Sequence, residues 1–149
     1  MKGNKMKSRV RIDRRKRRVV CALLQLYPEY KTWVNAEREN IIHGTPRGSE
    51  KVDNSNISDS TADKVLRCEK IEIDWRYRVV SAIDAAQDRI GWDIENEKLK
   101  KRLKTAIWQS CIDGRKNTYE SFYLPTIGRS AFYERRLLFI SDVANALAL

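Results

Sequence analysis

The chain has 149 residues, of which 42% are hydrophobic and 34% are charged, and its formal net charge is +10. This length suits one domain of ordinary size or two small units that share a core, and it excludes two large domains. The longest apolar run, residues 19–24, is far shorter than the roughly 20 residues of a membrane span, and no small-residue cleavage site follows it. We therefore expect an all-α, soluble, cytoplasmic protein that does not contact a membrane.

Cysteine and histidine are too few for most catalytic or metal chemistry. Cys21, Cys68 and Cys111 form neither a disulfide framework nor a Cys-x-x-Cys pair, so we expect reduced, buried side chains that pack like alanine. His43 is the single histidine, which excludes zinc-finger ligation. A Cys–His nucleophile pair stays formally open, although His43 before Gly44 is typical of a helix end. We expect no enzymatic activity, no cofactor and no metal site.

Positive charge is concentrated in two blocks of the sequence. Residues 1–18 hold ten Lys or Arg and one Asp, a net charge of +9, and residues 98–136 hold ten Lys or Arg and three acidic residues, a net charge of +7. Separated cationic clusters suit a polyphosphate, because each neutralised phosphate releases a condensed counterion. Double-stranded DNA is therefore the expected partner. A solubilising or disordered tail would equally explain the basic leader over residues 1–18.

The first half of the chain has helical periodicity interrupted by a proline. Apolar residues before Pro28 share one helical face, and Pro28 biases Tyr27 away from the helical region, so we expect a helix to end there. Pro28 also suits the first turn of a second helix. Residues 19–43 are thus expected to form an N-terminal helical hairpin or a kinked rod. Residues 44–59, rich in Gly, Pro, Ser and Asn, are expected to be a flexible linker.

Residues 60–149 are expected to form a helical domain that opens with a long helix over residues 60–90. Ser60 can cap the first turn of this helix. Alternation of apolar and polar residues over 71–79 also fits a half-buried strand, but the sequence offers no partner strand. A further helix is expected over residues 95–112. The expected inward face of the long helix consists of Val65, Cys68, Trp75, Val79, Ala82, Ile83, Ala86 and Ile90.

Residues 117–147 have the layout of a helix-turn-helix. Asn117 and Glu120 resemble a capping box for a short helix over residues 119–124, and a second helix begins at Arg129 after a tight connection. The expected inward residues of that second helix are Phe132, Phe139, Ile140, Val143 and Leu147. An ordinary helical hairpin with a solvated basic face would show the same pattern, and this alternative stays open.

The second helix of such a unit presents its first turn to the major groove. Arg129 can form bidentate hydrogen bonds with guanine, and Ser130 can reach a base or a phosphate. Tyr133 can stack or reach a phosphate, and Glu134 can accept a hydrogen bond from cytosine. The expected phosphate contacts come from Arg135, Arg136, Arg14, Arg15, Lys16, Arg17 and Arg18.

The motif IGRSAFYERR, at residues 127–136, resembles the C-terminal signature of ArpU-type phage transcriptional regulators, which are relatives of RinA-type late-gene activators. The motif TADKV at residues 61–65, after a segment rich in Ser, Asn and Gly, fits the same layout. The resemblance implies a C-terminal helix-turn-helix similar to region 4 of sigma factors, with Arg129, Ser130 and Tyr133 on the recognition helix. It also implies a phage or prophage protein that activates late genes with host RNA polymerase.

Two other classes of protein remain open. A DNA-packaging component, such as a small terminase-like subunit, also combines a helix-turn-helix with helical oligomerisation segments. A nonspecific nucleic-acid or RNA-binding module, or one that binds an acidic partner, would also use a basic face. A palindromic DNA site would imply a homodimer.

Overall fold

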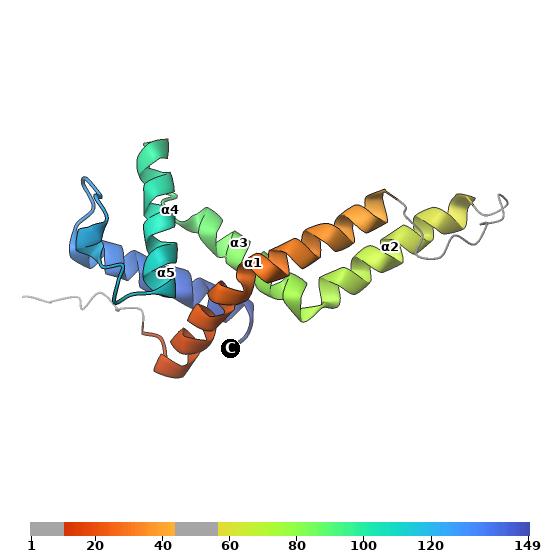
Figure 1. Ribbon diagram of the computed structural model, residues 1–149, viewed down its shortest axis with the longest axis horizontal. Helices are drawn as coiled ribbons and strands as arrows, with labels where there is room; N and C mark the ends of the chain where they lie inside the picture. Colours follow the sequence, from red (N-terminus) through yellow and green to blue (C-terminus); the bar gives the residue numbers. More distant parts are fainter. Residues whose placement is uncertain (1–10, 44–56) are drawn as a thin grey trace, which may run out of the picture. The chain divides into compact units, whose positions relative to one another are not determined.

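The computed structural model describes residues 11–43 and 57–149, and every regular element in these two ranges is helical (Figure 1). The elements are α1 (Arg14–Ile42), α2 (Ile57–Ile73), α3 (Trp75–Arg89), α4 (Glu97–Ile112), the 3-10 turn η1 (Tyr119–Ser121) and α5 (Arg129–Ala146). The expected all-α class is confirmed. Residues 1–10 of the basic leader and residues 44–56 of the expected linker lie outside the described residues, whereas residues 57–59 already belong to α2.

The chain divides into two compact units, which we describe separately. The first unit comprises residues 1–25 and 82–149, and the second comprises residues 26–81. α1 and α3 each contribute residues to both units. The start of α1, the end of α3, α4, η1 and α5 therefore belong to the first unit, which includes all the predicted DNA-binding residues.

α1 is one continuous helix, so of the two arrangements predicted over residues 19–43 the hairpin is wrong, and these residues form a single rod through Pro28. Pro28 lies inside this helix, where proline costs about 3 kcal/mol because it removes a backbone donor and crowds the preceding turn. Val20 and Leu24 before the proline and Val34 after it are buried. Each such side chain contributes about 1.5–3 kcal/mol on burial, so together they outweigh the proline. The prediction of a helix end at Tyr27 used only the backbone preference of the residue before a proline, and it left out the burial of these side chains.

The long helix predicted over residues 60–90 is interrupted at Asp74. The Asp74 carboxylate accepts hydrogen bonds from the Arg76 backbone N–H at 2.9 Å and from its guanidinium at 3.0 and 3.1 Å, so it caps the first turn of α3. The stretch 71–79 is helical on both sides of this break, as expected. However, Val65 and Cys68 in α2 and Trp75 at the start of α3 are exposed, against the prediction that they face inward. The predicted inward residues that are buried are Val79, Ala82, Ile83, Ala86 and Ile90.

Side chains of α1 and α3 meet in the second unit. The Arg76 guanidinium carbon lies 3.5 Å from the centroid of the Trp33 ring, and Arg38 Nη2 donates a hydrogen bond to the Tyr77 hydroxyl at 3.2 Å. A cation over an indole face contributes about 0.5–1 kcal/mol at an exposed site. Arg76, the residue that Asp74 binds at the break between α2 and α3, therefore also stacks on α1.

The core of the first unit forms where α4 crosses α5 (Figure 1). α4 begins at Glu97, two residues later than the expected residue 95, because Asn96 Oδ1 accepts hydrogen bonds from the backbone N–H groups of Lys98 and Leu99 at 3.1 and 3.3 Å. Its buried residues are Leu103, Ala106, Ile107, Ser110 and Cys111. The inward residues predicted for α5 are all buried, namely Phe132, Phe139, Ile140, Val143 and Leu147.

Candidate nucleic-acid interface

The segment before α5 is a compact loop with one 3-10 turn, shorter than the helix predicted over residues 119–124. The predicted capping box is not formed. The Asn117 side-chain amide donates a hydrogen bond to the Gln109 carbonyl at 3.2 Å, and Glu120 instead forms an ion pair with Arg129 at 3.3 Å. The second helix starts at Arg129 as predicted, but what precedes it is a structured loop.

An aromatic cluster fixes this loop against the first turns of α5. Phe132 is fully buried, and its ring centroid lies 5.7 Å from that of Tyr119, 5.9 Å from that of Phe122 and 5.2 Å from that of Tyr133. The Tyr119 hydroxyl also donates a hydrogen bond to the Ile127 carbonyl, and its backbone N–H donates one to the Tyr133 hydroxyl at 3.3 Å. Ring packing and two hydrogen bonds from Tyr119 therefore hold the loop against the start of α5.

The backbone of the tight connection differs from the glycine turn that the sequence indicates. Thr126 has a φ of 69°, a left-handed conformation that is costly for a β-branched residue. Gly128 has a φ of −74° and serves as the N-cap of α5, with no side chain to bind the free backbone N–H groups. The start of α5 therefore presents unpaired donors to solvent together with its first side chains.

Three of the predicted base-reading residues lie exposed on the first turns of α5, namely Arg129, Ser130 and Glu134. The Arg129 side chain is 68% exposed, and an exposed ion pair such as its contact with Glu120 contributes only about 0–1 kcal/mol, so a ligand can displace it. Tyr133 is different. It is half-buried, and its ring lies 4.8 Å from the Arg136 guanidinium carbon, so its packing fixes the local structure.

Arg135 is engaged within the protein. Its Nη1 and Nη2 atoms donate hydrogen bonds to the two carboxylate oxygens of Asp93, in the connection between α3 and α4, at 2.8 and 2.7 Å. Hydrogen bonding to this guanidinium lowers the pKa of Asp93 and raises that of Arg135. Arg135 therefore holds α5 against this connection, and the phosphate contact remains a prediction.

This ion pair makes folding stability depend on pH in the acid range. Because the Asp93 pKa is lowered in the folded protein, its contribution is fully present above the unfolded value of about 4 and is lost as the pH falls through the folded value. We expect Asp93→Asn to reduce the free energy of unfolding at neutral pH by about 1 kcal/mol or less, since both side chains are partly exposed. Urea denaturation should show this difference disappearing in acid. A difference that is constant with pH would contradict it.

Arg136 is also directed into the fold. Its Nη1 atom donates a hydrogen bond at 2.8 Å to the hydroxyl of Ser110, a buried residue of α4. Burial, together with the nearby Arg17, lowers the pKa of Arg136. A guanidinium in this position joins α5 to α4, so Arg136 has a structural role, and the phosphate contact remains a prediction.

The predicted phosphate-binding residues at the start of α1 are all exposed. They are Arg14, Arg15, Lys16, Arg17 and Arg18. The Asp13 carboxylate accepts a hydrogen bond from the Arg15 backbone N–H at 2.9 Å, and the first turn has no acidic residue. These five cations lie at the N-terminus of α1, which is the positive end of the helix dipole, so they repel one another and interact unfavourably with the dipole. A bound anion would reduce both repulsions. We call residues 14–18 the α1 basic cluster.

A second group of exposed cations was not among the predicted site residues. It consists of Lys98, Lys101, Arg102, Arg115 and Lys116, on α4 and just after it. Arg102 Nη1 donates a hydrogen bond to the Tyr123 carbonyl at 3.2 Å, which connects α4 to the loop before α5. The net charge of +7 over residues 98–136 indicated that a basic surface would form in this part of the chain. It could not indicate which of the Lys and Arg side chains would be exposed.

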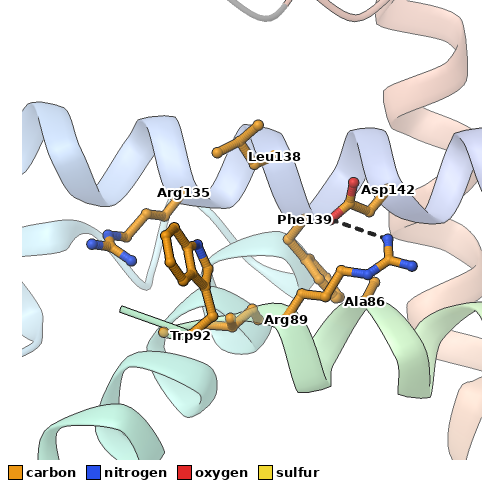
Figure 2. Close-up of a pocket in the computed structure, with 9 residues that line it drawn as sticks. Ala86, Arg89, Trp92, Arg135, Leu138, Phe139 and Asp142 are labelled. Carbon is orange, nitrogen blue, oxygen red and sulfur yellow. Dashed lines mark ion pairs between the residues drawn. The ribbon is translucent and has the colours of Figure 1, made fainter. Parts of the chain in front are cut away.

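A pocket of about 340 Å³ lies beside α5 (Figure 2). The exposed Trp92 indole stands next to Arg135, and Arg89 Nη1 lies 3.8 Å from the Asp142 carboxylate. The lining residues are Ala86, Arg89, Ile90, Gly91, Trp92, Arg135, Leu138, Phe139 and Asp142. They include one carboxylate, that of Asp142, and no serine, cysteine or histidine.

Within residues 11–43 and 57–149, no three His, Cys, Asp or Glu side chains gather as a metal site. The same part of the chain has no helix with the length and apolar character needed to cross a membrane. Comparison of the chain with protein-family models, with curated proteins and with solved structures finds no match. The resemblance to ArpU-type regulators therefore depends on the motif residues alone.

Proposed function

We propose that the protein binds duplex DNA sequence-specifically and regulates transcription, with α5 as its recognition helix. The observation that supports this most is that the exposed first turn of α5 and the α1 basic cluster belong to the same compact unit. One surface offers hydrogen-bonding side chains to base edges, and the other offers five cations to phosphates. The aromatic cluster around Phe132 supplies the rigid support that precise contacts to bases need.

Each exposed residue at the start of α5 has a distinct role in this proposal. Arg129 would bind guanine through two parallel hydrogen bonds, and Glu134 would accept one from the cytosine amino group. Ser130 lies where the free backbone N–H groups of α5 begin, so it would contact a phosphate or a base edge. The α1 basic cluster would supply affinity that depends on salt and not on sequence.

The motif at residues 127–136 extends the proposal to biological context. By its resemblance to ArpU-type regulators, the protein would be a phage or prophage product in the cytoplasm of a bacterial host, where it activates late genes together with host RNA polymerase. α5 would then be the recognition helix of that family's sigma region 4-like helix-turn-helix, with a loop that contains one 3-10 turn in place of the first helix. A palindromic operator would mean that the protein binds as a homodimer.

Arg129→Ala tests the proposal. Duplexes are first selected from a random pool at near-physiological salt, which suppresses nonspecific binding. The variant should then lose about 1–3 kcal/mol, or roughly 5- to 150-fold, in affinity for the selected duplex, and very little for a scrambled one.

Arg89→Ala is the matched control for this experiment. Arg89 is an arginine of the same unit, it is 65% exposed where Arg129 is 68% exposed, and it also forms a surface ion pair, with Asp142. We expect this control to keep the affinity for both duplexes. Equal losses on both duplexes for Arg129→Ala would refute base reading. An unenriched pool would instead favour a nonspecific nucleic-acid-binding role such as DNA packaging.

A further inference from the structure

α4 has a buried face and an exposed face. The buried residues are Leu103, Ala106, Ile107, Ser110 and Cys111. From Lys98 to the end of the helix, the exposed side chains recur at intervals of three or four residues, which is the spacing of a single helical face. They are Lys98, Lys101, Arg102, Thr105, Gln109 and Ile112. The exposed face therefore begins with three cations and continues with two uncharged polar side chains.

The charge on this exposed face has one sign. We call Lys98, Lys101 and Arg102 the α4 cation row. After Glu97 the helix contains no acidic residue, and Glu97 itself forms an ion pair with Lys100 at 3.7 Å. The cations of the first unit that the structure joins to carboxylates are Arg89, Lys100, Arg129 and Arg135. The row therefore presents three positive charges to solvent.

Two contacts place the α4 cation row near the start of α5. Arg102 Nη1 donates a hydrogen bond to the Tyr123 carbonyl at 3.2 Å, so the row reaches the loop before α5. In the same loop, Glu120 forms an ion pair with Arg129 at 3.3 Å. The loop thus contacts both the row and the first residue of α5, and all three belong to the first unit. A ligand bound at the start of α5 would lie close to the row.

The side chains of this face suit phosphates better than a protein surface. Protein–protein interfaces are centred on buried apolar and aromatic residues, and lysine is depleted from them. The exposed face of α4 has a single apolar side chain, that of Ile112, at its last residue. A nucleic-acid backbone instead presents regularly spaced negative charges, and each lysine or arginine that neutralises one releases a counterion.

We propose that the α4 cation row binds phosphates of the same DNA duplex that α5 reads, beside the bases in contact with Arg129. The inference rests on the proposed function, because it extends the contact that α5 makes with DNA. Lys98 and Lys101 lie about 4.5 Å apart along the helix axis, and neighbouring phosphates of one strand are about 3.4 Å apart along the duplex axis. Each lysine can therefore bind a different phosphate.

The double variant Lys98→Gln and Lys101→Gln tests this surface. Arg102 is left in place because it holds the loop, and glutamine keeps the helix preference of lysine, so the variant should fold. Fluorescence anisotropy with a scrambled duplex should give a salt slope shallower by up to about 1.8 and, at about 0.1 M salt, an affinity lower by roughly 10- to 100-fold. Lys64→Gln with Lys70→Gln, at exposed positions of α2 in the other unit, removes the same charge and should keep nearly the wild-type slope.

Ethylation of single phosphates on the selected duplex locates the contact. Because ethylation removes the charge of one phosphate, it should weaken binding wherever the protein contacts that phosphate. We expect one or two phosphates beside the bases read by α5 to matter for the wild-type protein and to have no effect in the double variant. The ratio of affinities for the selected and the scrambled duplex should stay unchanged in this variant, since phosphate contacts carry no sequence information.

Three results would overturn the inference. They are a salt slope equal to that of the α2 control, an ethylation pattern that is the same in the variant and the wild type, and a loss of affinity for a hairpin RNA without a loss for duplex DNA. Failure of the proposed function has a different signature, namely an unenriched pool or equal losses on both duplexes for Arg129→Ala. The salt slope on a scrambled duplex does not require sequence-specific binding, so the two failures are told apart.

Discussion

The triple variant Arg14→Gln, Arg15→Gln and Arg18→Gln is expected to bind every duplex more weakly and with a shallower dependence on salt. Each lost phosphate contact reduces the slope of log affinity against log salt by about 0.9, so three contacts reduce it by up to about 2.7 and the affinity at about 0.1 M salt by roughly 10²- to 10³-fold. Arg17 is left in place because its charge also lowers the pKa of the half-buried Arg136, so its removal would change more than a phosphate contact. Fluorescence anisotropy over a salt series, with the selected and the scrambled duplex, measures both quantities.

The chain offers a control with the same change in net charge. Lys64, Arg67 and Lys70 are exposed on α2, in the other unit, and their replacement by glutamine also removes three positive charges. We expect this second triple variant to keep nearly the wild-type salt slope, because a phosphate contact acts locally. Equal slopes for the two variants would mean that only net charge matters, and the α1 basic cluster would then have no role as a phosphate site.

Elements that depend on local periodicity could be predicted from the sequence. The start of α5 at Arg129 and its buried residues follow from apolar spacing after a proline and a glycine. Whether the chain folds back at Pro28 or continues as one helix could not be decided in this way, because the answer depends on what the residues on either side pack against. The break at Asp74 was hidden for another reason. A single side chain that caps the next turn does not disturb the period of the apolar residues around it.

The candidate site follows the same division. Arg129 and Ser130 are exposed where predicted, because the first turn of a surface helix presents its polar residues to solvent. Arg135 and Arg136 belong to the same helix, but their partners, Asp93 and Ser110, lie 42 and 26 residues away in the sequence. No local pattern says that such residues will meet.

Phe132→Ala is expected to cause the largest loss of stability of any single substitution considered for this protein. Phe132 is fully buried among three other aromatic rings, so its truncation removes buried apolar surface and leaves a cavity, at a cost of about 3–5 kcal/mol. Tyr123→Ala is the control, because Tyr123 belongs to the same loop but is 81% exposed, and we expect a change within about 0.5 kcal/mol. Urea denaturation followed by circular dichroism measures both.

A milder variant connects this stability to DNA binding. Phe132→Leu keeps most of the buried volume, so it should fold, at a smaller cost in stability than Phe132→Ala, but it removes the ring contacts to Tyr119 and Phe122 that hold the loop against α5. If the cluster orients Arg129, this variant should lose affinity for the selected duplex and keep its affinity for the scrambled one, as base contacts depend on position whereas phosphate attraction does not. Unchanged affinity for the selected duplex would show that α5 alone positions its first turn, and that the loop contributes only to stability.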